Sequence, residues 1–172
     1  ARRRELRQSD AKAIVDATHP FATEISGQLI GLAREFGIPY VRYERPESRS
    51  RPTAIYCRDM EAAAAEAVAK GTRIFLATGA KHLLTFLKHR LATKRQWFVR
   101  VAPDPASLER ALRFGIPRAH LCAMQGPFSR EFNETLWRSW DIDCVVTKDS
   151  GEAGGFQTKA DAAQAMGATL IV

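Results

Sequence analysis

The sequence predicts an α/β protein built from two Rossmann-like lobes with parallel sheets and helices on both faces, the first lobe being incomplete. Short β-rich apolar segments alternate with helical patterns along the chain, which indicates βαβ units and hence parallel strands. A polar segment without periodicity, Glu44 to Thr53, carries two prolines and separates a short first part from a longer second part. Only two expected strands precede it, too few for a complete lobe.

The expected strands are short and apolar, and they begin only after a polar, basic stretch at the start of the chain. They are Ala13–Asp16, Pro39–Tyr43, Ala54–Cys57, Arg73–Ala77, Trp97–Val101, Ala119–Ala123, Ile142–Thr147 and Thr169–Val172. We place the domain boundary so that residues 1–47 form a partial N-terminal lobe and residues 48–172 a C-terminal lobe. The second lobe is expected to be one complete five-stranded unit.

Helical patterns lie between most of these strands. Apolar residues recur at helical spacing from Ile25 to Phe36, and Gly37 is expected to end that helix. Two later helices are expected to run from a cap at Asp59 to Gly71 and from Pro105 to Gly115. A third is indicated by an apolar face formed by Phe128, Phe132, Leu136 and Trp140. The last is expected to begin with a cap at Thr158 and to end at Gly167.

Composition narrows the class of protein. A hydrophobic content of 45% with 26% charged residues is ordinary for a globular chain of 172 residues. No apolar run approaches the ~20 residues that span a bilayer, and no secretory signal is visible, so we expect a cytoplasmic location and no membrane partner. Cys57, Cys122 and Cys144 are predicted to be buried free thiols. The net charge of +7 and pI of about 9.7 suit an anionic partner without choosing among nucleic acid, membrane surface and acidic small molecule.

Four loops that follow strand ends combine polar residues with glycine or proline: Asp16–Pro20, Thr78–Lys81, Met124–Ser129 and Lys148–Lys159. In a parallel sheet such loops emerge on one edge, where ligands of open α/β sheets bind. No G-x-G-x-x-G or G-x-x-x-x-G-K-[ST] spacing occurs, and neither a zinc-ligand spacing nor a nucleophile elbow is present. No metal site is therefore expected.

The first two of these loops are suited to an anion at a helix start. Thr18 and His19 precede Pro20, and Thr78 precedes Gly79, where the backbone can be approached closely. The alternatives are that Thr18 only caps a helix and that the second pair forms a simple turn.

The loop after the strand Ile142–Thr147 carries the strongest signal. It combines Lys148, Asp149, Ser150 and Gly151 with Lys159, and a lysine at such a position is a compact charge for a carboxylate or phosphate. The alternative is an ion pair from Lys148 to Asp149 or Glu152. In the preceding loop, capping of a helix would by itself explain the hydroxyl of Ser129.

Four motifs occur in order: Asp-Ala-Thr-His-Pro-Phe-Ala (16–22), Ile-Pro-Tyr-Val-Arg-Tyr-Glu-Arg-Pro (38–46), Gly-Pro-Phe-Ser (126–129) and Thr-Lys-Asp-Ser-Gly (147–151). With them the chain resembles the precorrin-6A reductase family over nearly its whole length. Members of that family begin with a strand and a glycine-rich turn that this chain lacks. We therefore expect residues to be missing from its start, and a few from its end.

The resemblance implies a hydride transfer from NADPH, with NADH as a possible replacement, to the anionic tetrapyrrole precorrin-6A, which gives precorrin-6B in cobalamin (vitamin B12) biosynthesis. It implies that cofactor and macrocycle meet in a cleft between the lobes. On this basis Thr18, His19, Thr78 and Gly79 are expected to bind the cofactor, and Ser129, Lys148, Ser150, Gly151, Lys159, Arg42 and Arg45 the substrate. Lys148 and Asp149 are candidate proton donors, and an ordered water is an equal alternative.

Two rival functions stay open. The positive charge suits a nucleic-acid-binding α/β domain without catalytic activity, although its aromatic residues mostly follow the spacing of a helix core. A nucleotide-dependent transferase would use the same fold for different chemistry. The oligomeric state is not predicted.

Overall fold

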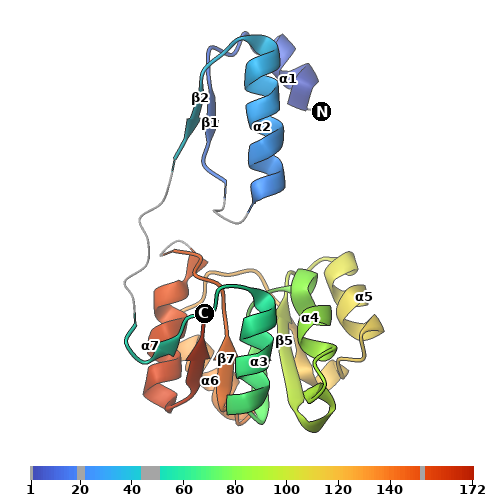
Figure 1. The fold of residues 1–172 in the computed structure, drawn as a ribbon, viewed down its shortest axis with the longest axis vertical. Helices are drawn as coiled ribbons and strands as arrows, with labels where there is room; N and C mark the ends of the chain where they lie inside the picture. The colour runs from blue at the N-terminus through green and yellow to red at the C-terminus, as the bar shows by residue number, and fades with distance from the viewer. Residues whose placement is uncertain (1, 19–21, 44–50, 152–153) are drawn as a thin grey trace. The chain divides into compact units, whose positions relative to one another are not determined.

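The computed structural model describes residues 2–18, 22–43, 51–151 and 154–172. The chain forms two compact units, unit 1 from Ala1 to Pro46 and unit 2 from Glu47 to Val172, and each is described by itself (Figure 1). The sequence-based boundary after residue 47 falls among residues 44–50, outside the described residues, and the assignment of the units as separate domains stays a prediction.

Unit 1 is a βαβ unit preceded by a short helix. Its elements are α1 (Arg2–Gln8), β1 (Ile14–Asp16), α2 (Thr23–Phe36) and β2 (Tyr40–Arg42). The strands β1 and β2 pair in parallel, and α2 lies alongside them (Figure 1). Ile14 and Asp16 are buried while Val15 between them is 67% exposed, so one face of the strand pair is covered and the other is open. The helix α2 ends as expected, because Gly37 adopts the left-handed conformation that stops a helix.

The helix α1 was not among the expected elements. Its sequence is polar and has no apolar periodicity, so its position depends on contacts with α2. Arg3 Nη2 donates to Glu35 Oε2 at 2.7 Å, and the Arg7 guanidinium lies 6.0 Å from the centre of the Phe36 ring. Such tertiary contacts are invisible to a reading of local periodicity.

Unit 2 contains, within the described residues, a six-stranded parallel sheet with the order β3-β8-β7-β4-β5-β6. Its strands are β3 (Ala54–Ile55), β4 (Arg73–Leu76), β5 (Gln96–Val101), β6 (Leu121–Ala123), β7 (Cys144–Val146) and β8 (Thr169–Ile171). The expectation of a five-stranded unit was therefore wrong. All six strands were nevertheless expected individually, including the short edge strand β3, in which Ala54 pairs with Leu170 and Ile55 with Ile171.

Helices cover both faces of this sheet, which confirms the α/β class. The elements are α3 (Met60–Lys70), η1 (Ala80–His82), α4 (Leu83–Leu87), η2 (Ala92–Lys94), α5 (Pro105–Arg113), η3 (Arg118–His120), α6 (Arg130–Ser139) and α7 (Phe156–Met166). One core cluster joins α3, α4 and α5 to strand residues such as Leu76 and Val99. The other joins α6 and α7 to residues such as Phe75 and Val145. Figure 1 draws α3 and α4 in front of the strands.

Several helix ends follow the sequence signals. Asp59 caps α3 by accepting from the backbone N–H of Ala62 at 2.7 Å. Gly71 after α3 is required for space, because a Cβ there would lie 2.5 Å from Cys144 Cβ and 2.8 Å from Ile74 Cγ1. Pro105 occupies the first turn of α5, as expected.

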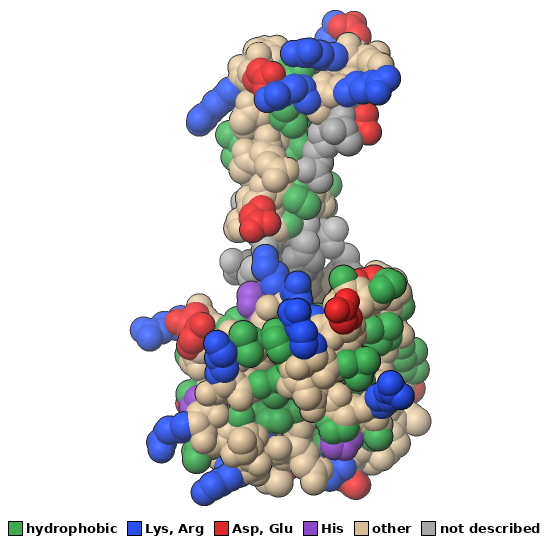
Figure 2. All heavy atoms as spheres, turned by 90° about the vertical axis from the view of Figure 1, so that its right-hand side faces the viewer, with side chains coloured by type: hydrophobic (Ala, Val, Ile, Leu, Met, Phe, Trp, Pro, Cys, Tyr) green, Lys and Arg blue, Asp and Glu red, His purple; other side chains and the backbone are tan. Residues whose placement is uncertain are grey.

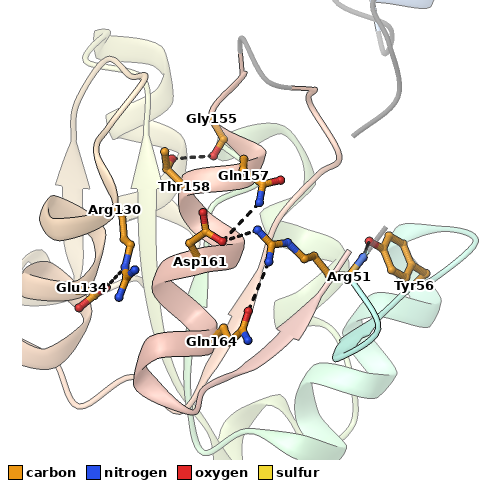
Figure 3. A network of polar contacts seen from close by, with 9 residues as sticks. All are labelled: Arg51, Tyr56, Arg130, Glu134, Gly155, Gln157, Thr158, Asp161 and Gln164. Atoms are coloured by element: carbon orange, nitrogen blue, oxygen red, sulfur yellow. Dashed lines mark hydrogen bonds and ion pairs between the residues drawn. The ribbon is translucent and has the colours of Figure 1, made fainter. Parts of the chain in front are cut away.

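The last two helices differ from expectation. Thr158 does not cap α7, because that helix begins one turn earlier at Phe156, after Gly155 in the left-handed conformation. The Thr158 hydroxyl instead shares its one proton between the carbonyls of Gly155 at 3.1 Å and Phe128 at 2.9 Å, and Figure 3 shows the first of these contacts. In α6 the fully buried residues are Asn133 and Trp137, whereas the residues of the expected apolar face are only partly buried.

Arg51 attaches the beginning of the described part of unit 2 to α7. Its guanidinium pairs with Asp161 and donates from Nη1 to Gln164 Oε1 at 3.4 Å, while its backbone N–H donates to the Tyr56 hydroxyl at 2.9 Å (Figure 3). This network holds the segment before β3 against the helix, and with it the edge of the sheet.

Candidate functional site

The strands β4 and β7 lie side by side at the centre of the sheet, and the chain leaves them toward opposite faces. After β4 it enters η1 and α4, which pack on one face, and after β7 it enters α7 on the other. The backbone N–H of Ala77 donates to the carbonyl of Val146 at 2.8 Å, so the two strand ends adjoin. Such a divergence is where open α/β sheets bind ligands. Thr78, Gly79 and the Lys148 loop therefore start from one place, as the sequence predicted.

Thr78 and Gly79 present polar backbone and a hydroxyl at this point. Thr78 is 6% exposed, and its hydroxyl has no hydrogen-bond partner among the described residues. Gly79 has a φ of +76°, which favours glycine, and a Cβ built there would meet no atom within 4 Å. A buried hydroxyl without a partner next to open space over a glycine suits a polar ligand group.

Lys148 contributes to a group of positive charges on the α4 side of the loop. It is half-buried, and burial followed by repulsion from Lys81 lowers its pKa below the usual range. The pKa of His82 is lowered by burial and then by Lys148 and Lys81. Asp149 next in the chain accepts from the backbone N–H of Gly151 at 3.1 Å. The alternative ion pair with Glu152 concerns a residue outside the described part of the chain.

Ser150 and Gly151 shape the turn of the same loop. Ser150 is 8% exposed, and its hydroxyl, like that of Thr78, has no partner among the described residues. Gly151 has a φ of +68°, and its carbonyl accepts from the N–H groups of Gly154 and Phe156 at 3.2 and 3.3 Å. The loop thus leads directly into the first turn of α7.

Lys159 lies in that first turn and is 8% exposed. Its ammonium donates to the carbonyl of Gly154 at 3.2 Å. Burial lowers its pKa to about 8, and repulsion from Arg100 adds to the effect, while attraction to Asp149 opposes it. A buried ammonium with a depressed pKa indicates a site at which an anion would relieve an unfavourable charge.

Arg100 belongs to this environment and was missed by the sequence analysis. It lies on β5, is 8% exposed, and donates from Nη1 to Asn133 Oδ1 at 2.9 Å. Its guanidinium carbon lies 4.3 Å from the centre of the Phe128 ring, and burial lowers its pKa to about 10. The available signal was a single charge inside the apolar run from Trp97 to Val101.

Ser129 acts as the N-cap of α6. Its hydroxyl oxygen accepts from the backbone N–H of Phe132 at 3.1 Å, so capping accounts for this side chain. The loop that contains it contacts α7 through the bond from Thr158 to the Phe128 carbonyl. A role of Ser129 in substrate binding stays a prediction.

Asp16 organises the predicted site residues of unit 1. It is 1% exposed and accepts hydrogen bonds from the hydroxyl of Thr18 at 2.6 Å, the hydroxyl of Tyr40 at 2.7 Å and Arg42 Nη1 at 3.2 Å. Hydrogen bonding with Thr18, followed by that with Tyr40 and Ser26, holds the pKa of Asp16 well below the usual range. Arg42 also donates to Ser26. Thr18 does not cap α2, because Ala22 occupies the N-cap position.

His19 and Arg45 lie outside the described residues. The structure describes the two units separately, so the predicted cleft between them stays a prediction, as do the roles of Thr18 and Arg42 in it.

Among the described residues, no group of three or more His, Cys, Asp or Glu side chains is placed to hold a metal ion. No helix in this part of the chain is long and apolar enough to span a bilayer. Of the three free thiols, Cys144 alone is fully buried.

Basic residues do not gather into one stripe on the face shown in Figure 2. Lys and Arg side chains are spread over both units and are separated by hydrophobic, acidic and other side chains. Trp137 is fully buried, and Phe128, Phe132 and Trp140 are half-buried. This distribution does not favour a surface that stacks nucleic-acid bases.

Comparison with known proteins finds a family model and individual proteins that all carry the precorrin reductase name. The family model described as "Precorrin-6x reductase CbiJ/CobK" matches residues 1–172. The chain is 36% identical over 169 residues to the cobalt-precorrin-6A reductase of Priestia megaterium, covering 97% of this chain and 66% of the relative. It is 36% identical over 173 residues to the precorrin-6A reductase of Mycobacterium tuberculosis (strain CDC 1551 / Oshkosh), covering 97% and 64%.

A solved structure, "CobK precorrin-6A reductase", is similar with a TM-score of 0.75 and 27% identity, covering 98% of this chain and 66% of that chain. The chain thus spans just under two thirds of the length of these similar proteins.

Proposed function

Because this chain belongs to the precorrin-6x reductase family, we propose that its protein reduces the precorrin-6A macrocycle in cobalamin biosynthesis. The hydride comes from NADPH, with NADH as the alternative, and the product is precorrin-6B. The similar proteins carry both the precorrin-6A and the cobalt-precorrin-6A name, so the substrate class is the metal-free or the cobalt-containing macrocycle.

The observation that carries this proposal is the set of buried cations and unpaired hydroxyls next to the switch point of the sheet. Lys148 and Lys159 have depressed pKa values because they are buried, and Ser150 supplies a hydroxyl without a protein partner among the described residues. The substrate carries acetate and propionate carboxylates. Carboxylates at these positions would restore favourable charge interactions and would orient the macrocycle.

The nicotinamide cofactor has a matching set of candidate residues. The Thr78 hydroxyl, which has no partner in the part of the chain that the structure describes, and the open space over Gly79 fit a polar group of a bound ligand. Thr18 and His19 are proposed to complete this set from unit 1. When bound, the reduced nicotinamide supplies the hydride; the residues of this chain bind and orient the two rings and exclude water.

A proton must also reach the macrocycle. Lys148 and Asp149 are the candidate donors. Burial and the repulsion from Lys81 make the ammonium of Lys148 release its proton more readily than an exposed lysine. An ordered water is the equal alternative.

The test follows NADPH absorbance with precorrin-6A as substrate, using the full-length polypeptide. Lys148→Ala and Lys159→Ala are expected to lower kcat/KM by about 10- to 100-fold each, the effect of losing a charged hydrogen bond. Lys94→Ala, which removes an exposed lysine of the same unit, serves as the control. If both site variants kept wild-type kcat/KM, the proposed carboxylate site would be wrong; if the wild type oxidised no cofactor with substrate, the proposed activity would be wrong.

A further inference from the structure

Arg100 occupies a position that a purely structural residue would fill with an apolar side chain. Along β5 the side chains alternate, so that Val99 and Val101 enter the core under α3, α4 and α5. Phe98 belongs to the core under α6 and α7, and Arg100 shares its side of the strand. The guanidinium thus lies on the face of the sheet that α6 and α7 cover.

The hydrogen bonds of this guanidinium are incomplete. A guanidinium has five N–H donors, and among the described residues its only hydrogen bond runs from Nη1 to Asn133 Oδ1. Asn133 is fully buried and is held in place by its own bond from Nδ2 to the Ser129 carbonyl at 2.9 Å. It therefore fixes one side of the guanidinium and leaves the remaining donors available.

Two aromatic rings flank the same group. The guanidinium carbon lies 4.3 Å from the centre of the Phe128 ring and 5.4 Å from that of Phe75. Ring faces stabilise a cation, but they do not neutralise it. The rings hold the guanidinium plane in position, which prepares it for the bidentate geometry that arginine offers to a carboxylate.

A second buried cation lies close to the first, because Thr158, the neighbour of Lys159 in the chain, donates to the carbonyl of Phe128, whose ring lies over the Arg100 guanidinium. Lys159 is as buried as Arg100, and the repulsion between the two lowers the pKa of Lys159 more than its attraction to Asp149 raises it. Among the described residues, neither cation forms an ion pair with a carboxylate. Two like charges in one protein interior destabilise the free protein, and a bound anion would remove that penalty.

We propose that Arg100 and Lys159 together bind one carboxylate side arm of the tetrapyrrole. The inference rests on the proposed function for the identity of the ligand, and it adds Arg100 as a substrate-binding residue. Arg100 binds the carboxylate through its free N–H donors, and the Lys159 ammonium binds it from the first turn of α7. Ser150, whose buried hydroxyl has no partner within residues 2–18, 22–43, 51–151 and 154–172, belongs to the loop that leads into this turn.

The test measures binding without requiring turnover. The probe is uroporphyrin I, a stable macrocycle with acetate and propionate arms, and its fully methylated ester is the uncharged comparison. Fluorescence titration of the full-length polypeptide compares the wild type with Arg100→Met, Arg100→Lys and Lys159→Gln. Arg58→Met is the matched control, because it removes the same charge from an arginine whose side chain is 90% exposed.

The expected result is a loss of affinity for the acid of about 10- to 100-fold in Arg100→Met and in Lys159→Gln, a smaller loss in Arg100→Lys, and none in Arg58→Met. The methyl ester is expected to bind all variants equally weakly. With precorrin-6A as substrate, Arg100→Met is expected to raise KM more than it lowers kcat. Circular dichroism verifies that each variant is folded. If Arg100→Met lost its native spectrum, the affinities of Arg100→Lys and Lys159→Gln for the acid would test the inference instead.

The inference would be overturned if affinity for the acid were unchanged in both Arg100→Lys and Lys159→Gln, or if Arg58→Met lost as much affinity as the site variants. Failure of the proposed function is recognised separately. If the wild type bound uroporphyrin through Arg100 but did not reduce precorrin-6A, the carboxylate site would be supported and the reductase activity would be refuted. If Arg100→Met reduced precorrin-6A with wild-type KM, the reductase activity would be supported and the carboxylate site would be refuted.

Discussion

Replacing Lys159 with methionine should make the ligand-free protein more stable. Methionine keeps the length of the side chain and removes a charge that is buried at 8% exposure. The pKa of Lys159 falls from its ordinary 10.5 to about 8. At about 1.36 kcal/mol for each pH unit, this difference corresponds to about 3.4 kcal/mol of unfavourable charge burial at neutral pH. Loss of the bond to the Gly154 carbonyl offsets about 1 kcal/mol, which leaves a net gain of about 2 kcal/mol.

The assay is urea unfolding followed by tryptophan fluorescence. All three tryptophans, Trp97, Trp137 and Trp140, lie in unit 2, so the signal reports the unit that contains Lys159. Lys94→Met removes an exposed charge from the same unit and is expected to change stability by less than about 0.5 kcal/mol.

The dependence on pH provides the decisive comparison. Because the folded pKa of Lys159 is below its unfolded value, the unfolded chain holds this proton between pH of about 8 and 10.5 while the folded chain has released it. The wild type therefore gains stability from this group as pH rises through that window, and Lys159→Met does not. The advantage of the variant should shrink there. A variant that is less stable than the wild type at neutral pH, with a difference that stays constant up to pH 10.5, would refute the reasoning.

Three other substitutions test the packing of the two units and the hydrogen bonds of Asp16. Gly71→Ala should destabilise unit 2 by about 1–3 kcal/mol in urea unfolding, because its Cβ would overlap Cys144. Gly31→Ala within α2 meets no atom within 4 Å and should stabilise unit 1 by about 0.5–1 kcal/mol, measured as slower amide hydrogen exchange in α2. Asp16→Asn should speed amide hydrogen exchange in unit 1, because it weakens the bonds from Thr18 and Arg42; in the wild type, the contribution of Asp16 should be present above its ordinary pKa of 3.8 and be lost as pH falls below it. Equal hydrogen exchange in the wild type and Asp16→Asn would contradict the Asp16 prediction. Equal stability of the wild type and Gly71→Ala would contradict the prediction about packing at Gly71.

Local signals predicted the elements that are determined locally. Gly37 ends α2 through its backbone conformation and Asp59 starts α3 through its side chain, and both effects involve only residues close in sequence. The start of α7 was misplaced because Gly155 begins it through backbone conformation, with no side-chain cap to reveal it. The helix α1 was missed because its contacts come from α2.

The residues of the candidate site likewise separate into those that local sequence signals predicted and those that only tertiary contacts reveal. Thr78, Lys148 and Ser150 were found because they follow strand ends, a position that the alternation of strands and helices makes visible. Arg100 was missed because its importance depends on burial between β5 and α6, which joins residues far apart in sequence. The capping role of Ser129 was foreseen and is observed, so its hydroxyl needs no ligand to explain it.

The two loops of the candidate site leave the middle of the sheet. The strands β4 and β7 that support them are flanked by β5 on one side and by β8 on the other, so each is anchored by hydrogen bonds along both of its borders. Insertions or sequence drift at the outer strand β3 would therefore leave the spacing of these two loops intact, whereas β6 leads into the loop of Phe128, whose ring lies over the Arg100 guanidinium. For protein engineering, the β3 margin of unit 2 is therefore a better place than the β6 margin to attach a tag or a fluorophore without disturbing recognition at its centre.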